Sequence, residues 1–349
     1  MPPRLRRSRA TLLAACLALG TGASSTAAQY PPLAPTPVLP LESFSQEPAL
    51  TGYLSVRQTV RDDTATFTVN RARITLQILP LRFAALRLQV DLSAVGRTRG
   101  DTVPATLLTD AYVQLVPPDT TSPAMRFLRP ALVVGQFRTP FSLEYLTPFS
   151  VLATASRSRA VDRLSSRRDL GVLAQVRFAR FATLTGAVVN GEGPNQTANP
   201  DGKQMAVGRL SLFPMRSLAL SGKWLGQGGD HRWGYDGRWL VRNLVIEGEA
   251  LVRTGPPGAA GAASDASGGY LLAAYRIRPW LQPVVKWERL RETTVTPAGE
   301  AELRLRSITY GINLLAPHDR LRLQVDWLAH SARPTRASDE LVAQLQAIF

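Results

Sequence analysis

The chain of 349 residues has little of what enzymatic chemistry needs: one cysteine, Cys16, three histidines and three lysines. A single cysteine cannot form an intramolecular disulfide. No histidine has a cysteine or acidic neighbour at metal-ligand spacing, and no glycine-rich phosphate-cradling loop is present. We therefore expect a protein that is not an enzyme and that uses no metal and no cofactor.

Long apolar runs are also absent. No stretch of eighteen apolar residues exists, so no transmembrane helix is expected. Four arginines precede the apolar stretch ATLLAACLALG (10–20), and SSTAAQ (24–29) offers small residues for cleavage, which predicts that residues 1–28 are a signal peptide. The sequence LAAC (13–16) also resembles a lipoprotein processing box, so lipidation of Cys16 stays open as an alternative.

Negative charge is scarce relative to positive charge. The formal net charge is +15, and removal of the four arginines of the signal peptide leaves +11. A basic exported protein could meet nucleic acid, an acidic surface or small anions. The sequence contains no nucleic-acid-binding motif, so no nucleic-acid partner is expected.

What the chain does contain is strand after strand. A proline-rich stretch at 29–48 is expected to form an extended periplasmic linker. Beyond it, segments such as RLRLQVDWLAH (320–330) alternate apolar and polar residues with the period of two that indicates a half-exposed strand. Sixteen strands are predicted, at 50–60, 65–78, 82–93, 106–116, 125–138, 168–178, 181–190, 203–213, 216–226, 232–241, 243–253, 269–278, 280–291, 302–314, 319–330 and 339–349.

The connections between these strands alternate between short and long. Tight turns on one side and longer loops on the other are typical of an outer-membrane barrel, and closure of the sheet removes its edges. We therefore expect residues 49–349 to form an all-β, transmembrane, antiparallel up-and-down β-barrel of about 16 strands. An arginine on the lipid side would cost about 2–4 kcal/mol at the bilayer midplane, so the strand arginines should face the lumen.

Aromatic residues near the predicted strand ends fit the interfacial girdle of such a barrel. They include Tyr53, Trp224, Trp239, Tyr275, Trp280 and Trp327. The sequence ends in VAQLQAIF (342–349), and a terminal strand closing on Phe349 resembles the signal that outer-membrane assembly machinery reads. A soluble, secreted β protein that binds polyanions remains an alternative.

The longest connection, at about 140–166, starts with apolar residues and then becomes basic. This third loop is expected to fold into the barrel and narrow the pore, although a solvent-exposed loop is the alternative. Guanidinium groups suit the oxygens of phosphate and carboxylate. We expect Arg157, Arg159 and Arg163 of the loop to face Arg71, Arg73 and Arg138. The expected anion-binding set of the constriction and lumen is Arg71, Arg73, Arg138, Arg157, Arg159, Arg163, Arg167 and Arg168.

Several segments resemble the phosphate-selective porin O and P family. They are VVGQFRTPFSLEYL (133–146), SRSRA (156–160) and RRDLGVLAQ (167–175), preceded in the same order by VNRARITLQ (69–77), LRLQVDL (86–92) and DAYVQL (110–115). The resemblance implies a sixteen-stranded barrel in the outer membrane of a Gram-negative bacterium, usually a homotrimer, that passes anions by diffusion past lumen arginines. Its partners would be small inorganic anions such as phosphate, together with outer-membrane lipid and lipopolysaccharide.

The sequence thus predicts a passive diffusion porin selective for small anions, with phosphate or polyphosphate among the candidate solutes. The family's phosphate-selective members line the approaches to the pore with lysines, and only three lysines are present here, which favours general anion passage. The alternative function is a structural or adhesion barrel with a plugged lumen and no channel activity.

Overall fold

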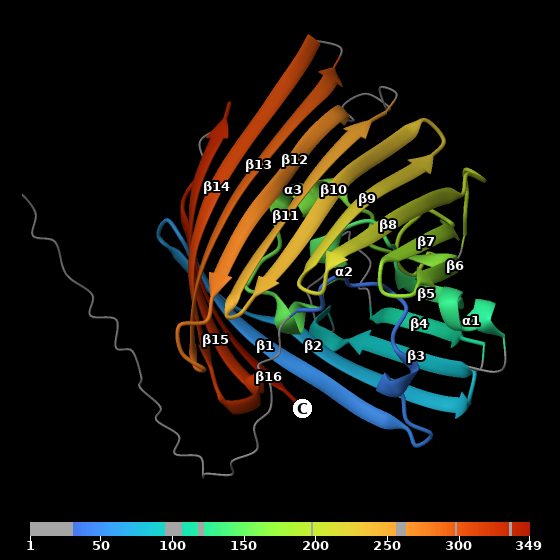
Figure 1. The fold of residues 1–349 in the computed structure, drawn as a ribbon. Helices are drawn as coiled ribbons and strands as arrows, with labels where there is room; N and C mark the ends of the chain where they lie inside the picture. The colour runs from blue at the N-terminus through green and yellow to red at the C-terminus, as the bar shows by residue number, and fades with distance from the viewer. Residues whose placement is uncertain are drawn as a thin grey trace, which may run out of the picture.

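The computed structural model describes residues 31–94, 107–117, 122–196, 198–255, 263–296, 299–334 and 337–349. Sixteen antiparallel strands within these residues form one closed barrel (Figure 1). Each strand pairs with its neighbours along the chain, and β1 (Ala49–Arg61) pairs with β16 (Glu340–Ile348) to close the sheet. The predicted all-β up-and-down barrel is confirmed.

The remaining strands follow the predicted order, and the boundaries mostly differ by a few residues. They are β2 (Thr64–Leu81), β3 (Ala84–Asp91), β4 (Leu108–Leu115), β5 (Ala131–Arg138), β6 (Arg168–Phe178), β7 (Ala182–Val189), β8 (Met205–Met215), β9 (Leu218–Gln227), β10 (Asp230–Val241), β11 (Leu244–Thr254), β12 (Ala263–Tyr275), β13 (Leu281–Thr296), β14 (Gly299–Leu315) and β15 (Leu321–Arg333).

One predicted strand is too long at its start. The prediction ran over 125–138, whereas a short helix, α1 (Pro123–Leu128), precedes β5. Proline is favoured in the first turn of a helix because its missing N–H has no intrahelical partner there. Arg129 then ends the helix in the left-handed conformation, with φ of 37°.

The barrel carries its apolar side chains outside and its polar side chains inside. Along β15, Arg322, Gln324 and Asp326 are buried, while Val325 and Trp327 are exposed. All six tryptophans of the chain are exposed on the outer face. This distribution is the reverse of that in a soluble β protein and is the one that lipid requires of a transmembrane barrel.

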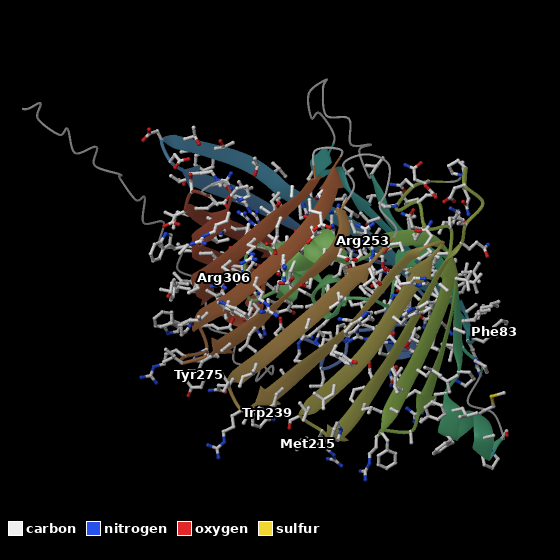
Figure 2. The ribbon with its side chains drawn as sticks, turned by 90° about the horizontal axis from the view of Figure 1, so that it is seen from above. Phe83, Met215, Trp239, Arg253, Tyr275 and Arg306 are labelled. Atoms are coloured by element: carbon white, nitrogen blue, oxygen red, sulfur yellow. The ribbon has the colours of Figure 1, made fainter. Side chains whose placement is uncertain are left out.

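Apolar side chains also mark the end of the barrel where the tight turns lie. Figure 2 shows Phe83, Met215, Trp239 and Tyr275 on the outer edge of the ribbon, and all four are exposed. Tyr53, which the sequence placed among these girdle aromatics, is instead buried and faces the lumen. None of the helices within the described ranges has the length and apolar character of a membrane span.

The expectation that the strand arginines face the lumen is wrong on β13 and β14, and also for Arg333 at the end of β15. In β13 and β14, Arg289, Arg291, Arg304 and Arg306 are exposed on the outer face. They lie beyond Trp287 toward the loop end of the barrel, away from the centre of the apolar belt. The cost of an outward arginine falls to about 0–1 kcal/mol near the membrane interface. An arginine is therefore tolerated on the lipid-facing side when it lies far enough from the bilayer midplane.

The proline-rich segment enters the barrel instead of forming an extended linker outside it. Leu39 exchanges two backbone hydrogen bonds with the Gln114 side chain, at 2.9 and 2.7 Å. Nearer the start of the segment, the Arg238 guanidinium donates to the carbonyl of Pro32. Gln114 and Arg238 are inward-facing side chains, so residues 32–39 line the lumen.

Candidate functional site

The connection between β5 and β6 also lies inside the barrel. It contains α2 (Leu143–Leu146), a 3₁₀ turn η3 (Phe149–Val151) and α3 (Arg159–Leu164). Figure 1 shows α2 and α3 within the ring of strands. We call residues 140–166 the inner loop. Its apolar side chains, among them Phe141 and Leu164, are almost fully buried, so the loop is packed against the barrel rather than solvated.

Carboxylates of β11 and β15 hold the inner loop through its backbone amides and one hydroxyl. Glu249 accepts hydrogen bonds from the Ser142 hydroxyl at 2.9 Å and from the Glu144 amide at 3.2 Å. Asp326 accepts from the Ala155 amide at 2.7 Å. Charge-assisted bonds of this kind are shorter and stronger than neutral ones, so the loop has a defined position.

Elsewhere in the same loop, three guanidinium groups lie around the ring of Phe149. Arg157 of the loop itself lies 3.9 Å from the ring centroid. Arg71 and Arg73 of β2 lie 4.5 and 5.8 Å from it. Cations within about 6 Å of a ring face are attracted to its quadrupole, so Phe149 helps three like charges to gather.

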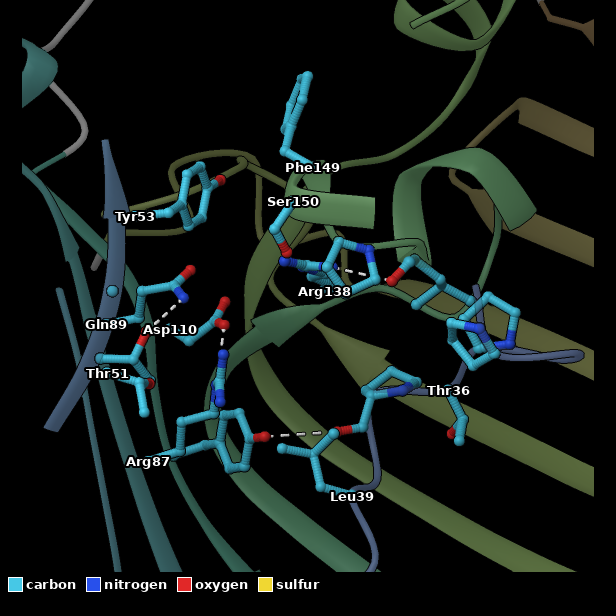
Figure 3. A pocket seen from close by; sticks show the side chains of 18 of the residues that line it. Thr36, Leu39, Thr51, Tyr53, Arg87, Gln89, Asp110, Arg138, Phe149 and Ser150 are labelled. Carbon is cyan, nitrogen blue, oxygen red and sulfur yellow. Dashed lines mark hydrogen bonds and ion pairs between the residues drawn. The ribbon is translucent and has the colours of Figure 1, made fainter. Parts of the chain in front are cut away.

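A cavity of about 320 Å³ lies beside this cluster (Figure 3). The N-terminal segment, strands β1 to β5 and the inner loop all contribute to its lining. Its charged lining residues are Arg87, Arg138 and Asp110. The cavity therefore lies between the inner loop, the N-terminal segment and strands β1 to β5.

Carboxylates compensate only part of the positive charge around the cavity. Asp110 accepts from Arg168 at 2.7 Å and from Arg87 at 3.2 Å. Asp91 accepts from Arg73 at 2.8 Å and lies 3.8 Å from Arg71. Arg138 donates to the backbone carbonyl of Leu146, at 2.8 Å, which carries no formal charge. Six arginines, counting Arg157, thus share two carboxylates.

Three buried donors in this region have no hydrogen-bond partner within the described part of the chain. They are the Tyr53 hydroxyl, Nε of Arg71 and Nη2 of Arg168. A buried polar group without a partner costs about 1–3 kcal/mol. All three are donors, so the group that would satisfy them is an acceptor such as an anion or water.

The structure brings together five of the eight arginines predicted as site residues: Arg71, Arg73, Arg138, Arg157 and Arg168. Arg157 is held by the loop itself, because its guanidinium donates to the carbonyls of Glu144 and Thr147, both at 3.1 Å. It therefore fixes the loop as well as adding charge.

The other three arginines lie elsewhere. Arg159 and Arg163, expected to face Arg71, Arg73 and Arg138, turn instead toward β15 and β13. Arg159 contacts His330 at 2.9 Å, and Arg163 pairs with Glu292 at 2.9 Å. Arg167 is exposed at the end of the inner loop. The path of the loop, which charge spacing cannot predict, separates them from the cluster.

The sequence reasoning missed Tyr53, Asp110 and Phe149 as parts of the site. A signal for Tyr53 exists, since it lies opposite Arg73 in the pairing of β1 with β2 and so shares its face. Phe149 carries no such signal, because its position depends on how the inner loop folds. Within the described ranges, no group of three histidine, cysteine or acidic side chains could hold a metal ion.

No protein-family model matches the chain, and no curated protein sequence matches it. Solved structures do resemble it. OmpF of Salmonella typhi, in a complex with daunomycin, aligns at 10% identity over 86% of this chain and 97% of that chain, with a TM-score of 0.65. DcaP of Acinetobacter baumannii, an outer membrane channel, aligns at 11% identity over 87% and 97%, with a TM-score of 0.60.

A trimer form of OmpT of Vibrio cholerae aligns at 10% identity over 87% of this chain and 99% of that chain, with a TM-score of 0.59. Identities this low establish a shared fold and nothing finer. The class that the fold defines is the transmembrane β-barrel of outer-membrane proteins.

Proposed function

We propose that this chain is a porin of the Gram-negative outer membrane that passes small anions by passive diffusion. The observation that carries the proposal is the group of six arginines that share two carboxylates around the cavity. Fixed positive charge inside a low-dielectric wall raises the local concentration of anions. The outward apolar face and the shared fold of outer-membrane channels support the location.

The path of the anion follows from the geometry. It would enter the cavity between β2 and the inner loop and exchange hydrogen bonds among Arg71, Arg138 and Arg168. The Tyr53 hydroxyl and the N–H groups of Arg71 and Arg168 that lack partners would donate hydrogen bonds to its oxygens or to a halide. Because cation–π contacts with Phe149 and two carboxylates already satisfy part of the charge, binding would stay weak enough for release.

The solute is proposed at the level of small inorganic anions, with phosphate as one member. Phosphate or polyphosphate specificity is the narrower form of the proposal, which the porin O and P resemblance supports and the scarcity of lysine opposes. A homotrimer is the proposed assembly, in line with the trimer form of the Vibrio cholerae OmpT structure. Residues 1–28 are proposed to be removed as a signal peptide.

The test is single-channel recording of the purified protein in planar bilayers under a potassium chloride gradient. We expect a reversal potential of the sign that indicates anion preference. Replacing chloride by phosphate on one side then ranks the two anions. A reversal potential that favours potassium would refute anion selectivity, and equal permeability of both anions would refute phosphate specificity.

One observation favours the alternative of a plugged, non-conducting barrel: residues 32–39 line the lumen together with the inner loop. Deleting residues 31–39 distinguishes the two. A porin should conduct before the deletion and conduct more after it. A chain that is silent in both forms would support the structural barrel, and one that conducts only after the deletion would make the segment a plug.

A further inference from the structure

Five arginines form a patch on the outside of the barrel, far from the lumen. They are Arg289 and Arg291 of β13, Arg304 and Arg306 of β14, and Arg333 of β15. All five are exposed. In each strand they continue the outward face that carries Trp287, Tyr310 and Trp327. We call these five residues the outer arginine patch.

Strand pairing places the members of the patch directly opposite one another. Arg289 is the partner of Arg306, and Arg291 is the partner of Arg304. Arg304 is in turn opposite Arg333 of the next strand. Like charges directly opposite on one face of an antiparallel pair are destabilising. Three such pairs in one place therefore call for a compensating negative charge.

The protein supplies only a small part of that charge. Glu302 pairs with Arg304 at 2.6 Å and also contacts Arg291. Within the described residues, Arg289, Arg306 and Arg333 make no ion pair. Glu300 shares the outward face but lies nearer the loop tip. Five guanidinium groups against two carboxylates leave an excess of positive charge.

The height of the patch on the barrel indicates what it meets. Trp287 precedes Arg289 by two residues on the same face, which is about 7 Å along a strand. Below it, the rings of Tyr310 and Trp327 stack at 5.7 Å. Aromatic side chains of this kind gather at the boundary between the acyl chains and the headgroups. The arginines just beyond them therefore lie at headgroup height.

We propose that the outer arginine patch binds the phosphate groups of the phosphorylated glycolipid in the loop-end leaflet. Guanidinium forks match phosphate oxygens bidentately, and one lipid would place its acyl chains on the apolar belt below. Free inorganic phosphate would use the arginines but not that belt. The inference rests on the proposed outer-membrane location and is independent of anion passage through the lumen.

The test compares two triple variants of the purified, detergent-solubilised protein. The patch variant is R289Q/R306Q/R333Q. The matched control is R180Q/R216Q/R242Q, which removes three exposed arginines from separate turns at the other end of the barrel. Each protein is incubated with diphosphorylated lipid A or with its dephosphorylated form, and bound lipid is counted by native mass spectrometry. Single-channel conductance of the same samples reports on the lumen and on folding.

The expected result is at least about tenfold less diphosphorylated lipid A on the patch variant than on the wild type or control, with conductance unchanged. Equal retention by the patch variant, or equal binding of dephosphorylated lipid A to the wild type, would overturn the proposal. Complete displacement by inorganic phosphate would assign the patch to free phosphate instead. A change in subunit assembly without a change in lipid would assign it to a contact between copies.

Discussion

The two sides of the lumen carry the same kinds of charged residues but pair them differently. On the side formed by β8 to β11, cations and carboxylates are matched. Lys223 lies 2.7 Å from Asp236 and 2.5 Å from Glu249, and Arg209 donates two hydrogen bonds to Asp236. On the side formed by β2 to β6, six arginines share two carboxylates, and Phe149 lies between three of them.

The difference assigns a separate role to each side. On the matched side, Glu249 pairs with Lys223 and at the same time accepts hydrogen bonds from the inner loop, so the charges there fix the inner loop in place. On the arginine side, three donors lack partners and a cavity adjoins them. The matched side is therefore expected to govern stability, and the arginine side selectivity.

The largest effect should come from breaking the matched side. Lys223→Met leaves the carboxylates of Asp236 and Glu249 buried with fewer partners. Removing one member of a buried ion pair typically costs about 3–5 kcal/mol. We expect the variant to lower the unfolding midpoint strongly, measured by loss of the compact, heat-modifiable band on gels after stepwise heating.

Lys203→Met is the control, because Lys203 is exposed in the connection between β7 and β8. It removes the same charge and should leave the midpoint unchanged. If both variants unfold alike, the matched network adds nothing beyond its net charge, and the distinction between the two sides would not hold for stability.

A smaller effect should follow from neutralising one arginine on the arginine side. Arg71 has a side chain that is 26% exposed, lies over Phe149 and has an Nε without a hydrogen-bond partner. Arg71→Gln is expected to lower the anion-to-cation permeability ratio several-fold, measured by reversal potential, because it removes positive charge from the cluster beside the cavity.

Arg163→Gln is the matched control for Arg71→Gln. It also removes one positive charge, in this case from α3 of the inner loop beside β13. Its side chain is 61% exposed and pairs with Glu292, so the lumen should lose little net field there. We expect a clearly smaller change in reversal potential than for Arg71→Gln. Equal changes would mean that total charge rather than the arginine cluster determines selectivity.

The strands of the barrel could be predicted from the sequence, but the height of their side chains along the barrel could not. Period-two alternation and the spacing of turns predicted sixteen strands, and β6 has the predicted limits of 168 and 178. Alternation assigns faces, so Arg71 and Arg73 could be brought to the lumen side of β2. It does not give height along the barrel, which is why the outward arginines at 289 and 306 were not foreseen.

The inner loop marks where prediction from the sequence ends. Its length and its apolar start predicted an inward path, but the partners of each arginine depend on the three-dimensional course of the loop. Arg157 and Arg159 are two residues apart, yet one lies over Phe149 and the other contacts His330. The N-terminal segment shows the same limit, since proline content predicts extension and not location.

The smallest expected effect concerns acidity and the docking of the inner loop. Glu144 of the inner loop accepts hydrogen bonds from Lys286 at 3.1 Å and from the Ser158 amide at 2.8 Å. Burial raises the pKa of its carboxyl to about 7, against the opposing effect of Lys286. The docked loop thus holds a proton that an undocked, hydrated loop would release near its ordinary pKa of 4.5.

A raised pKa in the docked state stabilises docking fully below the ordinary pKa, and this contribution is lost as the pH rises through about 7. Protease cleavage within 140–166 should therefore become faster between pH 5 and pH 8 after correction for the enzyme's own pH dependence. Glu144→Gln should flatten that slope, whereas Glu47→Gln, at an exposed position, should preserve it. A slope that survives in Glu144→Gln would assign the pH dependence to another titrating group.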